Sequence, residues 1–271
     1  MNICFNGNFL PGDQPILPSS NSSFKWGDGL FETMKFRKGQ LVLENLHFER
    51  LFISLQLLEI EKTSDFTQDN LRKQVAELCR QNNCSENARI RLAIYRTNGN
   101  QTGYVIEAVP LDNATNQWNI EGIVLGLYPY ARKATDAFAN LKSANFLPYV
   151  LAKRYAEVNR FGDAIVLNTH SLLCDTSKAN IFLVSKQEIY TPALHQGCVN
   201  GTMRRTVIDV AKNLGFRIHQ DEVTEEQLLH ADEVFLTNAI HIIRWVRQYK
   251  ERPYTNVITR QIFEAVTATI F

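Results

Sequence analysis

The sequence lacks the features that would place it in a membrane, in a secretory route or on nucleic acid. No run approaches the roughly 20 apolar residues of a membrane span, and residues 1–6 hold no basic stretch followed by an apolar block. The 29 Lys plus Arg balance the 28 Asp plus Glu, so the charge gives no reason to expect a nucleic-acid partner. These absences predict a cytoplasmic protein that binds neither membrane nor nucleic acid.

Cysteine and histidine are too scattered to indicate a metal site. The five cysteines are odd in number and form none of the close pairs typical of zinc or thioredoxin-like sites. The six histidines likewise lack the short repeats that zinc sites favour. We therefore expect no metal, and cysteines that are mostly reduced core residues.

Hydrophobic periodicity predicts two lobes. The first lobe, over residues 1–112, has a mixed α+β pattern, and polar residues 113–120 form the predicted linker. Residues 121–271 form the larger second lobe. The first lobe's expected strands are 30–36, 41–44, 88–95 and 104–109, and its expected helices are 46–58 and 67–82. The second lobe's expected strands include 123–128, 163–168, 180–184 and 233–237, with helices at 146–156, 202–213 and 257–271.

Lys142 and Asp175 are the residues that point most directly to chemistry. Lys142 lies in the segment NLKSANF at 140–146, and Asp175 follows 33 positions later in LCDTSKANIF. A lysine amine can bond to the aldehyde of pyridoxal phosphate, while a carboxylate keeps the ring nitrogen of that cofactor protonated. Either residue alone is weak evidence, because most lysines are solvated surface cations.

Four blocks give these two residues a context. They are GDGLFETM at 27–34, HFERL at 47–51, the segment from Lys142 to Asn180, and GCVNGTMR at 197–204 followed by DEVFLTNA at 232–239. In this order the blocks resemble the class IV aminotransferases, or fold-type IV pyridoxal phosphate enzymes, over nearly the whole chain. The resemblance implies a two-lobed α+β / α/β fold like that of D-amino acid aminotransferase, with the cofactor lysine in the larger lobe.

The resemblance also implies roles for individual residues. Lys142 would be the catalytic lysine, Asp175 would contact the ring nitrogen, and the forked guanidinium of Arg50 would bind the cofactor phosphate. Backbone amides in two loops would complete the phosphate site, since free amides at a helix start attract anions. The loop residues are Val199, Thr202, Met203, Asn238 and Ala239.

Asp175 departs from the family pattern. The family usually places a glutamate five residues before the asparagine that is Asn180 in this chain. Aspartate is one methylene shorter but can form the same charged hydrogen bond if the backbone lies closer. We expect Asp175 to keep the role, with a direct or a water-bridged contact to the ring.

The reaction itself is less constrained, because lyases and transaminases share the cofactor site. The blocks VNGTMR and TNA are similar to those of aminodeoxychorismate lyases, which release pyruvate and leave 4-aminobenzoate on the folate pathway. The alternative is an aminotransferase acting on branched-chain or D-amino acids with 2-oxoglutarate. Branched-chain enzymes tend to carry Gly-Ile-Thr-Arg, and D-amino acid enzymes carry an Arg-x-His pair on a strand. Gly-Ile-Thr-Arg is absent from the chain, and the comparable strand, which carries Arg89, Arg91 and Arg96, has no such histidine.

Substrate contacts and assembly complete the expectations. Arg91 and Arg96 lie on one predicted strand but on opposite faces, so at most one should reach a substrate. Arg96, beside the turn at 97–99, is our choice, and Thr33 is a candidate polar contact. We also expect a homodimer, because two-fold dimers are common and the apolar strands containing residues 92–94 and 105–106 look too numerous for a small lobe to bury alone.

Overall fold

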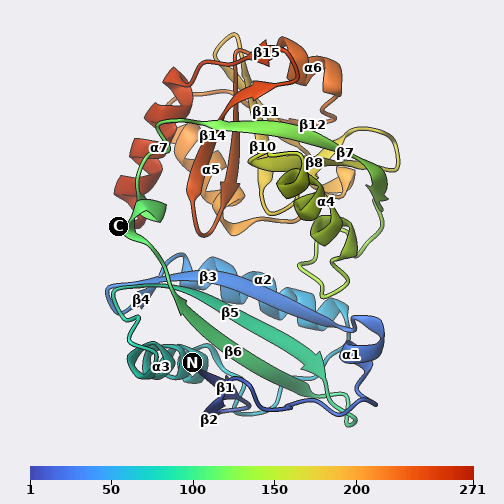
Figure 1. Ribbon diagram of the computed structural model, residues 1–271, viewed down its shortest axis with the longest axis vertical. Coiled ribbons are helices and arrows are strands. Elements are labelled where there is room, and N and C mark those ends of the chain that lie inside the picture. The colour runs from blue at the N-terminus through green and yellow to red at the C-terminus, as the bar shows by residue number, and fades with distance from the viewer. The chain divides into compact units, whose positions relative to one another are not determined.

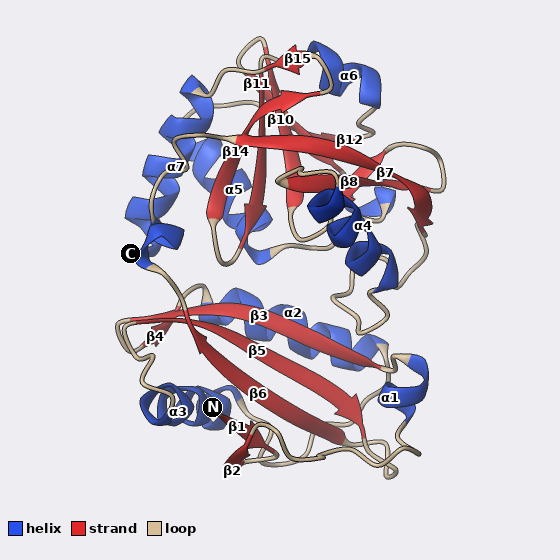
Figure 2. Ribbon diagram, viewed as in Figure 1, coloured by secondary structure: helices blue, strands red, loops and turns tan.

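The computed structural model describes all residues, 1–271, and divides into two compact units (Figures 1 and 2). The first unit contains Met1–Thr115 and Leu141–Asn145, and the second contains Asn116–Asn140 and Phe146–Phe271. The 3₁₀ helix η1 (Asn113–Asn116) lies within the predicted linker. One expectation needs correction: residues 121–271 do not form one uninterrupted lobe, because the segment that carries Lys142 packs with the first unit.

The first unit is a six-stranded sheet in the order β2-β1-β6-β5-β3-β4. Its strands are β1 (Asn2–Phe5), β2 (Asn8–Pro11), β3 (Gly29–Arg37), β4 (Gln40–Leu41), β5 (Asn87–Arg96) and β6 (Thr102–Pro110), and its helices are α1 (Ser22–Trp26), α2 (Glu44–Leu57) and α3 (Gln68–Gln81). Side chains alternate across the strands, so Leu30, Met34, Ile90 and Ile106 face one side of the sheet and share a core with residues of α2 and α3. Figure 2 shows this sheet with its helices.

Two sequence expectations about the first unit are wrong in detail. The predicted strand at 41–44 is only the two-residue β4, because α2 already begins at Glu44. The apolar strand residues that motivated the dimer are largely buried within the chain itself, with Leu92 1%, Ile94 3% and Ile106 0% exposed. Burial by α2 and α3 therefore accounts for them without a partner.

The second unit is a nine-stranded sheet in the order β12-β11-β10-β13-β14-β7-β8-β9, with β15 paired to β14. Its strands are β7 (Ile123–Lys133), β8 (Asp163–Asn168), β9 (Leu173–Thr176), β10 (Asn180–Ser185), β11 (Glu188–Pro192), β12 (Ile218–Asp221), β13 (Glu233–Asn238), β14 (Ile242–Tyr249) and β15 (Arg252–Pro253). Its helices are α4 (Leu147–Val158), α5 (Thr202–Asn213), α6 (Glu225–His230) and α7 (Val257–Ile270), with the 3₁₀ helix η2 (Leu194–Gln196). None of the helices in the chain has the length and apolar character needed to cross a membrane.

A tight turn between β8 and β9 places Asp175 in the sheet. The Asn168 side-chain oxygen accepts hydrogen bonds from the amides of His170 and Leu172, and Ser171 adopts a φ of 62°. An asparagine side chain commonly stabilises such a turn by bonding the backbone two residues on. The chain then returns antiparallel, with Asp175 opposite Val166.

Candidate active site

Lys142 lies on a short segment that pairs with the open edge of β3. The Phe31 amide donates to the Lys142 carbonyl over 2.9 Å, and the Ala144 amide donates to the Gly29 carbonyl over 2.8 Å. Because β4 pairs with β3 only at Phe36 and Arg37, this stretch of the edge is open to the lysine segment. Backbone pairing thus fixes where the lysine side chain starts.

The Phe31 ring lies beside two cations. The Lys142 Nζ is 4.3 Å and the Arg91 guanidinium carbon 4.5 Å from the ring centroid. An aromatic face attracts cations through its quadrupole. Thr33 lies directly opposite Arg91 in the pairing of β3 with β5, on the same face as Phe31. The candidate polar contact Thr33 therefore shares a sheet face with Arg91.

Arg91 has an unused donor. Its Nη1 is buried without a hydrogen-bond partner, and burial lowers the pKa of the guanidinium, with Glu107 opposing the shift. Buried donors normally have partners, so an orphaned one marks a place where a ligand or water can bind. A carboxylate is the natural acceptor for such a guanidinium.

Arg50 is held in a buried cluster that the sequence did not predict. Its Nε donates to Glu32 Oε1 over 2.7 Å, its Nη2 lies 2.5 Å from Glu32 Oε2, and His47 Nδ1 lies 2.7 Å from the same Oε2. His47 and Arg50 are three residues apart on α2, so both face the same side of the helix. The cluster orients the arginine that the family resemblance associates with phosphate.

Electrostatics fix the charges in this cluster. Burial acts to raise the pKa of Glu32, but Arg50 and His47 together lower it to about 2. Burial also lowers the pKa of His47, against the attraction of Glu32, and the positive charge of Lys142 adds to the lowering. Glu32 is therefore a carboxylate at neutral pH, and His47 is a neutral imidazole that donates Nδ1–H to it.

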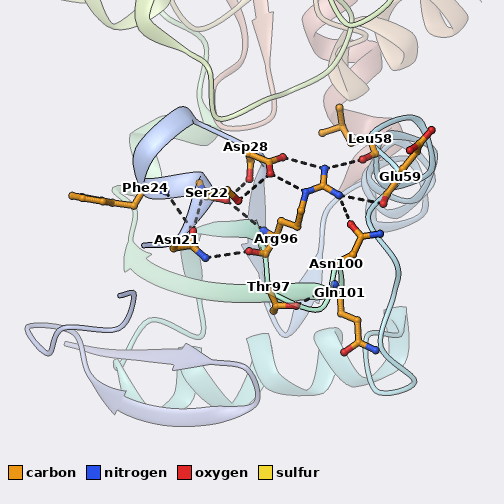
Figure 3. Close-up of polar contacts among 11 residues, drawn as sticks. Asn21, Ser22, Phe24, Asp28, Leu58, Glu59, Arg96, Thr97, Asn100 and Gln101 are labelled. Atoms are coloured by element: carbon orange, nitrogen blue, oxygen red, sulfur yellow. Dashed lines mark hydrogen bonds and ion pairs between the residues drawn. The ribbon is translucent and has the colours of Figure 1, made fainter. Parts of the chain in front are cut away.

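The Arg96 guanidinium is fully engaged in hydrogen bonds within the first unit (Figure 3). Its guanidinium donates to both Asp28 oxygens, to the Leu58 and Glu59 carbonyls and to the Asn100 side chain. All five N–H groups of an arginine are thereby engaged. This geometry leaves no donor for a substrate carboxylate, so it does not support our choice of Arg96 over Arg91.

Asp175, in the second unit, is 2% exposed and accepts hydrogen bonds on both oxygens. Its Oδ2 lies 2.7 Å from the Tyr149 hydroxyl, 3.0 Å from the Val199 amide and 3.3 Å from the Lys133 Nζ, and its Oδ1 accepts from the Asn180 side chain over 2.8 Å. An oxygen with one donor has a second lone pair that can accept another. Oδ1 therefore has the capacity to accept one further hydrogen bond.

The loop before α5 is built around the same acid. Val199 donates its amide to Asp175 and accepts from the Asn180 side chain at its carbonyl, over 2.8 Å. A Cβ on Gly201 would collide with the Asn180 Oδ1, and Asn180 could move away only by disturbing its hydrogen bonds to Asp175 and Val199. Thr202 and Met203 open α5 with their side chains buried. The backbone amides of this first turn, and not these two side chains, are therefore the groups suited to an anion.

The third predicted loop follows β13. The Asn238 side chain accepts from the amides of Ile240 and His241 and donates to the Lys178 carbonyl, so it shapes the turn that contains Ala239. Just before it, the Thr237 hydroxyl is buried and has no hydrogen-bond partner. A buried hydroxyl without a partner marks a place where a ligand or a water molecule can bind.

Sequence reasoning missed several residues that complete these two groups. Glu32 lies inside the block GDGLFETM, and nothing in its spacing from His47 and Arg50 indicates that the three side chains pair. Tyr149 and Lys133 meet Asp175 only through the fold, from α4 and β7. No group of three or more His, Cys, Asp or Glu side chains in the chain could hold a metal ion.

Known proteins of one family are similar to this chain over most of its length. The amino-transferase class IV family model matches residues 29–249. The aminodeoxychorismate lyase of Vibrio harveyi is 30% identical over 86% of this chain and 86% of its own length. A putative branched-chain-amino-acid aminotransferase of Methanocaldococcus jannaschii is 28% identical over 88% of this chain and 84% of its own.

A solved structure shares the fold. The branched-chain aminotransferase of Thermoproteus uzoniensis, solved with norvaline, superposes with a TM-score of 0.88 at 24% identity, covering 100% of this chain and 94% of that one. The family model spans most of the sequence, and the Vibrio harveyi relative is similar over nearly its whole length. The chain therefore belongs to the class IV aminotransferase family of enzymes.

Proposed function

We propose that the protein is a pyridoxal phosphate-dependent lyase that converts 4-amino-4-deoxychorismate to 4-aminobenzoate and pyruvate. The observation that carries the proposal is the place of the lyase-like VNG block: Val199 donates its amide to the buried Asp175, and its carbonyl accepts from Asn180. The loop sequence and the acid thus form one hydrogen-bonded group. The similarity to the Vibrio harveyi lyase supports the same choice.

The residues fit the cofactor on grounds independent of the family. Arg91 and Thr237 carry buried polar atoms without partners, which a bound ligand can satisfy. We propose that Lys142 bonds to the aldehyde of the cofactor and that Asp175 contacts its ring nitrogen. Its phosphate would be bound by Arg50, by the first amides of α5 and by the loop at 237–239.

Each residue then has a defined task. Bound pyridoxal phosphate supplies an aldehyde for the substrate amine and a ring that accepts electrons from the neighbouring carbon. The carboxylate of Asp175 holds the proton on the ring nitrogen. The amine of Lys142, once displaced by substrate, removes the proton from the carbon next to the substrate nitrogen. Arg91 binds a substrate carboxylate beside the Phe31 ring.

An aminotransferase is the second candidate, because the Methanocaldococcus jannaschii relative at 28% identity carries that name. The two reactions differ after proton removal: a lyase loses a neighbouring leaving group, whereas an aminotransferase passes the amino group to an acceptor acid. The same active-site residues can serve both.

One pair of assays separates the candidates. Purified protein would be supplied with pyridoxal phosphate and either 4-amino-4-deoxychorismate, measuring pyruvate, or branched-chain and D-amino acids with 2-oxoglutarate, measuring glutamate. We expect faster pyruvate release, abolished in Lys142→Ala. The matched control is Lys153→Ala, which removes a largely exposed lysine paired with Glu157 and should leave the rate unchanged. Glutamate formation without pyruvate release would overturn the lyase assignment in favour of the aminotransferase.

A further inference from the structure

Asp175 is a fully buried acid whose hydrogen-bond partners include only one cation. The amide groups of Val199 and Asn180 and the hydroxyl of Tyr149 are neutral donors. The ammonium of Lys133, 3.3 Å from Oδ2, is the charged one. A buried carboxylate that lacks a paired cation tends to take up a proton instead of staying ionised.

The pairing of two strands fixes the position of Lys133. It is the last residue of β7, and it pairs in register with Asn168 of the neighbouring β8, whose hairpin leads to Asp175. Its side chain is 12% exposed, and its Nζ also lies 5.2 Å from the centroid of the Tyr149 ring. Exclusion of water strengthens the attraction between the two charges.

None of the other titratable groups around Asp175 supplies a positive charge that is hydrogen-bonded to its carboxylate. Burial and the nearby acid raise the pKa of Tyr149 well above its ordinary value, so the phenol remains a neutral donor. Burial likewise raises the pKa of the Cys174 thiol, and raises that of Cys198 to about 12. Arg204 feels the acid electrostatically but donates its Nη2 to the Pro192 carbonyl and the Gln220 side chain.

We propose that Lys133 is the internal counter-ion of Asp175: it keeps the buried acid ionised and positioned before a cofactor is present, so that the ring nitrogen meets a carboxylate. The inference rests on the proposed function for its purpose, but the ion pair itself belongs to the cofactor-free protein. Lys133 is accordingly a positioning residue that acts through Asp175. The direction of titration agrees, because burial raises the pKa of Asp175 and Lys133 opposes that rise.

A double-mutant cycle on the cofactor-free protein tests the ion pair. The variants are Lys133→Met, Asp175→Asn and their combination, and urea unfolding is measured at about pH 5 and about pH 8. Without the lysine, the folded-state pKa of Asp175 rises further above its unfolded value. The penalty for ionising the acid therefore grows as pH rises, and Lys133→Met should cost more stability at the higher pH.

In the Asp175→Asn background the same substitution should cost nothing or be stabilising, since it removes a largely buried cation that lacks an anionic partner. Lys133→Arg should retain most of the stability. Arg132→Met is the matched control: this neighbouring cation bonds only to backbone carbonyls and should show no pH-dependent cost. An equal cost of Lys133→Met in both backgrounds, or at both pH values, would overturn the proposal.

Cofactor binding supplies the second readout. Equilibrium dialysis against pyridoxal phosphate over a pH series should show the acidic limb of binding shifted upward by about one pH unit or more in Lys133→Met, with Lys133→Arg close to wild type. Failure of wild type to bind cofactor would sink the proposed function while leaving the stability cycle decisive for the ion pair. Binding by wild type with an unshifted limb in Lys133→Met would refute the positioning role.

Discussion

The Glu32 carboxylate holds the Arg50 guanidinium through two hydrogen bonds, from Nε over 2.7 Å and Nη2 over 2.5 Å, inside the first unit. Both side chains are nearly inaccessible, with 2% and 8% exposed. A charge pair of this kind limits the arginine to one orientation, and the His47 ring on the same carboxylate leaves Glu32 little freedom. Glu32 thus orients Arg50 for the proposed contact with the cofactor phosphate.

Replacing this acid should make the stability of the fold less dependent on pH. Glu32 has its pKa lowered from 4.5 to about 2 in the folded protein, so its stabilisation is present above the unfolded value and is lost as pH falls towards 2. We expect Glu32→Gln to cost on the order of 3 kcal/mol at neutral pH. Denaturant unfolding of both proteins over a pH series measures this, and the difference should shrink between about pH 4.5 and pH 2. A constant difference would contradict the assigned charges.

Arg50 and Asp175 should fail in different ways when replaced. Arg50→Ala removes a charged donor and should weaken pyridoxal phosphate binding by about 2 to 3 kcal/mol, roughly 30- to 150-fold. Asp175→Asn should spare binding more than turnover, because it mainly removes the charge that stabilises the protonated ring nitrogen. Dialysis and steady-state rates on the two variants separate these effects. Small and equal losses in both variants would contradict the assignments.

Arg91 should control substrate affinity. We expect Arg91→Ala to raise KM about 10- to 100-fold, with a smaller change in kcat, because a carboxylate contact is made in the bound substrate as well as in the transition state. Arg89→Ala is the control, since Arg89 lies two residues away on the same strand face but is exposed. If the two variants have the same KM, Arg91 does not bind substrate.

The expected homodimer remains to be tested in solution. The argument from the apolar strands is lost because those strands are buried, whereas the commonness of two-fold dimers still favours the proposal. In addition, Phe24 and Trp26 of α1 are 72% and 78% exposed, and Ile53 and Leu57 of α2 are each 51% exposed. Exposed apolar side chains mark an interaction surface where they form a contiguous patch. Light scattering should give about twice the 31.0 kDa chain mass. A monomer at low micromolar concentration would end the dimer proposal and leave the chemistry of Lys142 unaffected.

The sequence predicted the long, strongly patterned elements and missed the short ones. The helices at α2, α3 and α5 follow from apolar periodicity. The β1–β2 hairpin was overlooked although Asn6-Gly7, with φ of 47° and 85°, is a strong hairpin signal. Helix α6 also had a readable start, since Thr224 and Gln227 form a capping box.

The site residues likewise fall into those that the sequence identifies and those that only the fold brings together. Residues carried by contiguous motifs, such as Lys142, Arg50 and Val199, could be named from the sequence. Residues that act by tertiary contact could not, because the pairing of Lys133 with Asp175 spans 42 positions and depends on the sheet order. The choice between Arg91 and Arg96 as the substrate-binding arginine could not be made from the sequence for the same reason. Both residues lie on β5, and only their tertiary contacts distinguish them.

The covalent state of Lys142 tests the central claim most directly. Wild-type protein loaded with pyridoxal phosphate would be reduced with borohydride, digested and analysed by peptide mass spectrometry. We expect one pyridoxyl group per chain on the peptide that contains Lys142, and none in Lys142→Ala treated in the same way. Modification spread over exposed lysines such as Lys153, or none on Lys142, would contradict the account.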